Sequence, residues 1–188
     1  SHGISSGLLT LLVKSIIRRN FYLNRDKSLG AIMELINDVL IAEMGATDHY
    51  VTGVLVRLDG DRVEYVNCAS PDILFRSGKT GRAGRVLDSA GESLTGRFLG
   101  VTEMKEPFSA VTIAMERGDC LFLYTDCLSE AKNRQGRSYE ETGIMASLQN
   151  APGGTAREIL DHIMEKFNEF RDGNPVRDDL TAILIRRI

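Results

Sequence analysis

The sequence contains no tryptophan and few other aromatic residues, so its core must be built mainly from leucine, isoleucine and valine. It also lacks an apolar run of the roughly 18 residues that a membrane-spanning helix needs. Lys14 and Arg18 follow closely on the first apolar stretch, residues 8–13, which is therefore neither a signal sequence nor an anchor. We expect a soluble chain, while the sequence leaves open whether a longer parent protein is attached to a membrane.

Cysteine and histidine are scarce, with three of each in 188 residues. The odd number of cysteines and the lack of a C-x-x-C pair argue against a metal knuckle or a redox pair. Reduced thiols in a cytosolic compartment are the simplest interpretation, which predicts a cytoplasmic domain. Because the histidines are scattered as well, a zinc site is not expected.

A strong excess of charge is also absent, since the formal net charge is −3 and the pI is near 5.7. This balance argues against binding to nucleic acid or to an anionic membrane surface. Apolar residues make up 43% and charged residues 26% of the chain, as in an ordinary globular protein. No repeat, low-complexity tract or linker divides the sequence, so we predict a single domain over residues 1–188.

Hydrophobic periodicity predicts both helices and strands. Asp59-Gly60 is a hairpin turn signal, Thr155 and Glu158 form a capping box, and residues 77–91 have the composition of a loop. The predicted helices cover residues 4–22, 28–44, 138–149 and 156–170, and the predicted strands cover residues 51–58, 62–67, 73–75, 108–115, 120–125 and 180–185. This order indicates an α+β fold, and two stacked antiparallel sheets with helices on their outer sides would fit it.

An aspartate stands at the end of the most apolar predicted strand. Residues 120–125 run into Asp126, and a carboxylate there is costly to desolvate unless a partner compensates its charge. A divalent cation is one such partner. The alternative is that Asp126 caps the turn at Cys127 and Leu128, and the strand alone leaves both interpretations open.

A second acidic site precedes the last predicted strand. Asp178 and Asp179 are adjacent, so their charges repel one another, and a cation would relieve that repulsion. The alternative is a solvated loop in which Arg177 is their partner. If the two strands are neighbours in one sheet, Asp126 and Asp178 converge, and such an oxygen-rich site suits Mg²⁺ or Mn²⁺.

Both acidic segments resemble motifs of one protein family. The sequence LFLYTDCLSEAKNR at 121–134 resembles the LLLYTDGLTEARN segment of the SpoIIE/RsbU branch of the PPM metal-dependent protein phosphatases, and RDDLTAILIR at 177–186 resembles its closing DDxTLLVLR. Further segments resemble the branch in the same order and spacing: SHGISSGLLTLLVKS at 1–15, VEYVNCASPDIL at 63–74, FLGV at 98–101 and MERGDCLFLYTD at 115–126. Together they cover essentially the whole chain.

The resemblance implies an αββα sandwich and hydrolysis of phosphoserine or phosphothreonine on a bacterial regulatory protein. It implies two Mn²⁺ or Mg²⁺ ions that hold a bridging hydroxide for attack on phosphorus, with Asp126 and Asp178 as metal ligands. Other residues would shape the site without supplying its main ligands: Asp179, Thr125, Gly3 and His2.

The resemblance also implies partners. The expected substrate is a phosphoprotein of the anti-sigma-factor antagonist class, which would make the domain part of sigma-factor regulation. A sensor domain is expected upstream in the parent chain. A homodimer through exposed sheet edges is a further expectation.

The chain departs from the family pattern at three points. The family's bridging aspartate and first N-terminal strands would lie upstream of Ser1, so we expect this chain to bind metal weakly and to hydrolyse slowly. Cys127 stands where the family usually has glycine, which predicts roughly 1 kcal/mol of strain in a turn that needs positive φ. Ser70 replaces a histidine, which affects loop packing or partner contact. Two alternatives stay open: a non-catalytic pseudophosphatase that binds a signalling protein, and an unrelated α+β domain whose aspartates only cap turns.

Overall fold

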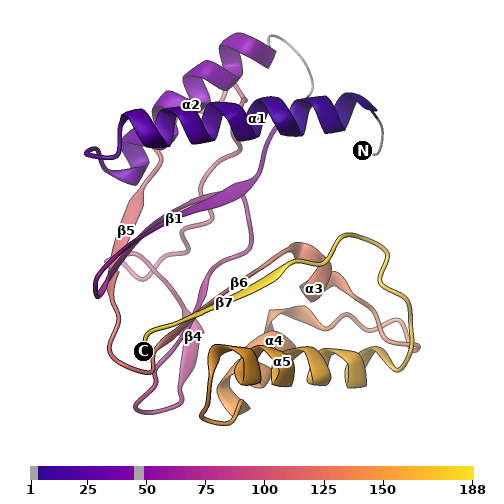
Figure 1. The fold of residues 1–188 in the computed structure, drawn as a ribbon. Helices are drawn as coiled ribbons and strands as arrows, with labels where there is room; N and C mark the ends of the chain where they lie inside the picture. The colour runs from indigo at the N-terminus through magenta and orange to yellow at the C-terminus, as the bar shows by residue number, and fades with distance from the viewer. Residues whose placement is uncertain (1–3, 45–48) are drawn as a thin grey trace. The chain divides into compact units, whose positions relative to one another are not determined.

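The computed structural model describes residues 4–44 and 49–188, which form two compact units (Figure 1). The first unit runs to Asp59 and includes Val63–Ala69 and Thr95–Thr112. The second unit is built from Gly60–Arg62, Ser70–Leu94 and Ile113–Ile188. Each unit contains helices and one sheet, so the chain is α+β, as predicted.

The first unit combines two helices with a three-stranded sheet. Helix α1 (Ile4–Leu23) packs against α2 (Leu29–Met44), and the sheet has the order β1-β2-β5. Its strands are β1 (Gly53–Asp59), β2 (Arg62–Cys68) and β5 (Ala110–Ala114). The core joins the apolar face of α2 to residues of α1 and β2, namely Leu29, Ile32, Met33, Ile36, Leu40, Val13, Ile16, Val66 and Cys68.

Backbone geometry requires glycine at two positions of the chain. Gly60 has a φ of +59° in the tight turn between β1 and β2, a conformation that favours glycine. At Gly30 in the first turn of α2, an added Cβ would lie 2.4 Å from the backbone oxygen of Phe108. The missing side chain therefore lets α2 approach the segment that leads into β5.

The second unit contains a four-stranded sheet of order β4-β3-β6-β7, in which every pair of neighbours is antiparallel. Its strands are β3 (Leu74–Arg76), β4 (Ala83–Arg85), β6 (Cys120–Tyr124) and β7 (Ala182–Arg186). Strand β6 lies between β3 and β7, and all of its residues except Leu123 are buried. This position explains its nearly continuous apolar run.

Three helices complete the second unit: α3 (Asp126–Glu130), α4 (Glu140–Asn150) and α5 (Ala156–Arg171). Because side chains alternate between the faces of a strand, Cys120, Phe122 and Tyr124 of β6 point to the same side. They join one buried cluster with residues of the three helices, including Leu128, Ile144, Leu148, Ile159, Ile163 and Phe167. Helices α4 and α5 therefore cover this face of the sheet.

Helix α5 begins with the predicted capping box. The Thr155 hydroxyl accepts a hydrogen bond from the backbone N–H of Glu158 (3.2 Å), and the Glu158 carboxylate accepts one from the backbone N–H of Thr155 (2.7 Å). The bond from the Thr155 backbone, followed by the bond from its hydroxyl, holds the pKa of Glu158 below its ordinary value. These bonds satisfy N–H groups that no helical carbonyl can reach.

We expect Glu158→Gln to lower the melting temperature at neutral pH and to lose this effect in acid. Because the folded-state pKa is depressed, the ionised carboxylate stabilises the fold above the unfolded pKa, about 4.3 for glutamate, and that contribution is lost as the pH falls through the folded value. Thermal unfolding followed by circular dichroism, from neutral pH down to a pH below the pKa of Glu158, measures the difference in melting temperature between the wild type and the variant. Glu165→Gln, in the interior of the same helix, is the control, and a pH-independent difference for Glu158→Gln would contradict the prediction.

The predicted helices and strands all occur in the predicted order. Each observed end lies within two residues of the predicted one. Two elements were missed. Strand β4 lies in the segment predicted as a loop, and α3 follows β6 directly. The prediction of a single domain over residues 1–188 stays a prediction. Among residues 4–44 and 49–188, no helix is both long enough and apolar enough to cross a bilayer.

Candidate functional site

The candidate site lies where β6 ends and β7 begins. The two strands are antiparallel neighbours with Tyr124 opposite Ala182, so the C-terminal end of β6 lies beside the N-terminal end of β7. Their pairing continues one step further, because the backbone N–H of Thr125 donates to the backbone oxygen of Thr181 (3.0 Å). The segments that carry Asp126 and Asp178 therefore leave the sheet at the same edge.

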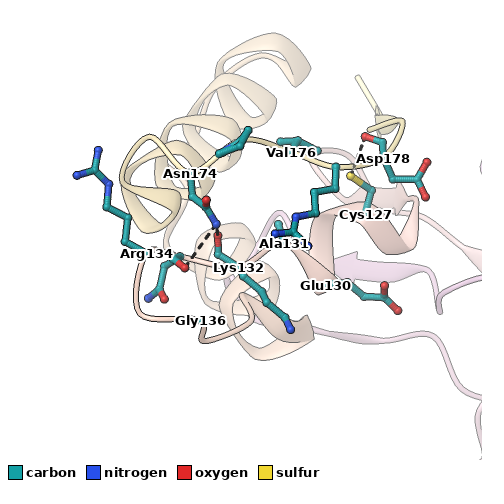
Figure 2. A pocket seen from close by; sticks show the side chains of 12 residues that line it. Cys127, Glu130, Ala131, Lys132, Arg134, Gly136, Asn174, Val176 and Asp178 are labelled. Carbon is teal, nitrogen blue, oxygen red and sulfur yellow. Dashed lines mark hydrogen bonds between the residues drawn. The ribbon is translucent and has the colours of Figure 1, made fainter.

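Two side chains connect these segments. The hydroxyl of Thr125 donates to the backbone oxygen of Asp179 (3.1 Å) and accepts from the backbone N–H of Thr181 (3.0 Å). The thiol of Cys127 donates to the backbone oxygen of Asp178 (3.2 Å), as Figure 2 shows. Thr125 and Cys127 thus fix the acidic segment before β7 against the end of β6.

The side chains of Asp126, Asp178 and Asp179 are exposed at this edge. One oxygen of Asp126 accepts from the backbone N–H of Cys127 (2.9 Å), and one oxygen of Asp178 accepts from the backbone N–H of Asp179 (2.8 Å). Among the described residues, the other oxygen of each of these two carboxylates has no hydrogen-bond partner. Each can therefore serve as a ligand.

The pKa of the Cys127 thiol is affected by the carboxylates of Asp126, Asp178 and Asp179, which all lie near it. Burial raises this pKa most, and the negative charges of Asp178, Asp126 and Asp179 raise it further. A raised pKa keeps the thiol protonated at neutral pH, which suits its role as a hydrogen-bond donor. The sequence-predicted carboxylates therefore share one electrostatic environment.

The strain predicted at Cys127 is wrong. Among the described residues other than glycine, only Ala69, Glu140 and Asp172 have positive φ. Cys127 is instead the second residue of α3, because the helix begins at Asp126 and the chain does not need the left-handed turn that would favour glycine.

The alternative interpretations of the aspartates can be compared with these contacts. The bond from Cys127 N–H to Asp126 satisfies one of the first donors of α3, as turn capping would require. In the described part of the chain, Arg177 forms no ion pair with Asp178 or Asp179, so it does not neutralise that pair. His2 and Gly3 lie outside the described residues.

The donor set suits a hard divalent cation in kind, since it consists of exposed carboxylate oxygens. It is small: within residues 4–44 and 49–188, no group of three or more histidine, cysteine, aspartate or glutamate residues is arranged to hold a metal ion. Asp126 and Asp178 alone therefore do not complete a coordination shell for such an ion.

A cavity of about 470 Å³ adjoins this edge (Figure 2). Its wall includes Cys127 and Asp178 at one end and Arg134 and Gly136 at the other. Two segments form most of it: one runs from Glu130, the last residue of α3, to Gly136, and the other is residues 174–178 before β7. Asp178 therefore belongs both to this cavity and to the acidic edge, the name used below for the sheet edge that carries Asp126, Asp178 and Asp179.

Two asparagines hold the cavity walls. Asn133 is buried, and its side-chain oxygen accepts from the backbone N–H groups of Gln135 and Arg137 (3.0 Å each). The side chain of Asn174 donates to the backbone oxygens of Lys132 (2.6 Å) and Asn133 (3.5 Å). Sequence analysis missed this cavity, although asparagine followed three residues later by Gly136 is a turn signal that it could have used.

Comparison with known proteins gives a family and a fold. A profile of the family described as "Stage II sporulation protein E (SpoIIE)" matches residues 2–188. No curated protein matches the sequence.

Solved structures resemble the chain at low sequence identity. The SiaA-PP2C domain of Pseudomonas aeruginosa is 17% identical, with a TM-score of 0.78 over 99% of this chain and 72% of that one. The PP2C phosphatase domain of SpoIIE from Bacillus subtilis, solved with a fragment of its regulatory domain, is 15% identical (TM-score 0.74, 98% of this chain and 51% of that one). The structure of the RsbU and RsbW domains of Rv1364c from Mycobacterium tuberculosis is 16% identical, with a TM-score of 0.69 over 100% of this chain and 49% of that one. The chain thus spans about half the length of the last two, and these similarities show the fold.

Proposed function

Since the chain belongs to the SpoIIE family of PP2C-type protein serine/threonine phosphatases, we propose that it hydrolyses phosphoserine or phosphothreonine on a regulatory protein. The observation that supports this most is the sheet edge at which β6 and β7 bring Asp126 and Asp178 together. Two exposed carboxylates on adjacent strand ends suit cation-assisted chemistry better than they suit structural capping.

We propose that Asp126 and Asp178 hold Mn²⁺ or Mg²⁺, two ions in the complete site, and that Asp179 supports them. Among similar solved structures, one of the SpoIIE phosphatase domain was presoaked with Mn, and one of RsbX is in complex with magnesium. When bound, such ions supply Lewis-acid stabilisation of the charge on the phosphoryl oxygens.

The chain's own residues would orient these ligands. Thr125 contacts the segment before β7 through both a donated and an accepted hydrogen bond, and Cys127 holds the backbone oxygen of Asp178. These contacts limit the movement of Asp178 relative to Asp126. His2 and Gly3 are proposed, from the family resemblance alone, to shape the same site.

We further propose that the substrate is an anti-sigma-factor antagonist and that another domain of the parent protein controls activity. Structures similar to this chain carry a fragment of a regulatory domain in SpoIIE and an RsbW domain in Rv1364c. The three cysteines are free and buried, which fits a reducing cytoplasm.

Removing divalent metal should abolish the activity. The protein as its gene encodes it is assayed on a phosphoserine peptide with Mn²⁺, with Mg²⁺ and after chelation, and we expect hydrolysis only with metal. Re-addition of Mn²⁺ should restore it, which serves as the control for irreversible damage by the chelator. Turnover that persists after chelation would contradict the metal assignment. Binding of phosphopeptide without turnover under any condition would support the pseudophosphatase instead.

A further inference from the structure

The cavity beside the acidic edge is lined by more cationic than anionic side chains. Lys132, Arg134 and Arg177 contribute positive charge, and Glu130 and Asp178 contribute negative charge. The whole chain has a formal net charge of −3, so the cavity is locally opposite in sign to the protein. A cation bound at Asp178 would increase this difference.

Two of the three cations are available to a ligand. Arg134 has a partner, because its Nε lies 3.5 Å from a carboxylate oxygen of Asp172. Lys132 and Arg177 are exposed, and neither forms an ion pair within the part of the chain that the structure describes. Exposed cations that converge on one concave surface favour an anionic ligand.

The walls of the cavity are already formed. Asn174 connects its two segments through the backbone oxygens of Lys132 and Asn133, and the Asn174 backbone oxygen accepts from Arg171 of α5 (2.5 Å). An isolated antiparallel β-bridge between Lys132 and Ser138 joins the two ends of the loop between them. A preformed cavity loses little conformational entropy when it binds a ligand.

We propose that this cavity binds an acidic segment of the phosphoprotein substrate, next to the phosphorylated residue. Asp178 lies at one end of the cavity and belongs to the acidic edge proposed to act on the phosphate (Figure 2). With the phosphorylated residue at that edge, the neighbouring residues of the substrate would enter the cavity. A volume of about 470 Å³ accommodates a few side chains. The position of the phosphate rests on the proposed function, whereas the preference for acidic residues rests on the cavity itself.

The test compares two phosphoserine peptides, one with aspartate and glutamate on both sides of the phosphoserine and one with asparagine and glutamine in their place. We expect the full protein with Mn²⁺ to prefer the acidic peptide in kcat/KM by about tenfold, since each exposed charge pair contributes a small factor. Lys132→Glu and Arg177→Glu should each reduce this ratio, and the double variant should bring it close to one. Lys166→Glu, on α5 and outside the cavity lining, is the matched control and should keep the ratio.

A ratio of two substrates on one variant cancels any general loss of activity, so a variant that only weakens the acidic edge leaves it unchanged. If the wild type hydrolyses neither peptide, the proposed function fails, and fluorescence anisotropy of the unphosphorylated labelled peptides still tests the cavity. Tighter binding of the acidic peptide, weakened by salt and by Lys132→Glu, supports the proposal. Equal binding of the two peptides, or an acidic preference that survives in the double variant, overturns it.

Discussion

Replacing Asp126 or Asp178 by asparagine should lower Mn²⁺-dependent hydrolysis of a phosphoserine peptide by at least about 100-fold, because even loss of residues that only orient metal ligands costs about 10- to 100-fold. Asparagine keeps the oxygen that accepts from the backbone of Cys127 or Asp179, but it removes the negative charge that attracts the cation. Both side chains are exposed, so the fold should be little affected. Steady-state kinetics and calorimetric titration with Mn²⁺ measure the two losses.

The control for this prediction is Asp161→Asn. Asp161 is also an exposed aspartate of the second unit, but it pairs with Arg157 on α5 and takes no part in the acidic edge. The control should keep full activity and an unchanged melting temperature. If both the Asp126→Asn and the Asp178→Asn variant kept wild-type kinetics, the assignment of these residues as metal ligands would be wrong.

Replacing Phe167 by alanine should destabilise the second unit by about 3–5 kcal/mol, the usual cost of removing a buried phenyl ring. Phe167 is 1% exposed, its ring lies 5.5 Å from that of Tyr139, and it packs in the cluster between α5 and β6. The loss is comparable to a large part of the stability of a typical domain. Urea unfolding followed by circular dichroism measures it.

Ile183→Ala is the matched comparison for Phe167→Ala. Ile183 lies on β7 of the same sheet but is 50% exposed, so its removal leaves little cavity. We expect a much smaller change in the free energy of unfolding. A similar loss for both variants would mean that the cluster around Phe167 does not form the core of this unit.

Local sequence signals predicted the elements whose stability comes from their own residues. The capping box of Thr155 and Glu158 forms as predicted because both of its partners lie within one helical turn. The apolar run of β6 predicted a buried strand because burial on both faces removes the need for alternation.

The elements that were missed depend on their neighbours. Strand β4 is three residues long and contains Gly84, and it exists because β3 offers its backbone as a partner. Such pairing carries no signal of residue type. The error at Cys127 came from assuming the family's glycine turn, whereas the backbone there is helical.

The acidic edge could be predicted in part. Asp126 and Asp178 were identified because each follows or precedes an apolar strand, and the pairing of β6 with β7 brings their segments together. Only the turn from Asn133 to Gly136 in the cavity wall carried a local signal. The rest of the cavity could not be predicted, because the Asn174 side chain joins its walls through backbone oxygens of residues about forty positions away. Any residue type supplies such an oxygen.

Asp178 contributes at once to the acidic edge and to the cavity wall, and this sharing has a thermodynamic consequence. A cation bound by this carboxylate and an anion bound in the cavity beside it cannot bind independently of each other. If a divalent ion at Asp178 makes the cavity more attractive to an anion by some factor, the anion must strengthen the binding of the ion by the same factor. Occupancy of the cavity by substrate would therefore help to load the protein with its own cofactor.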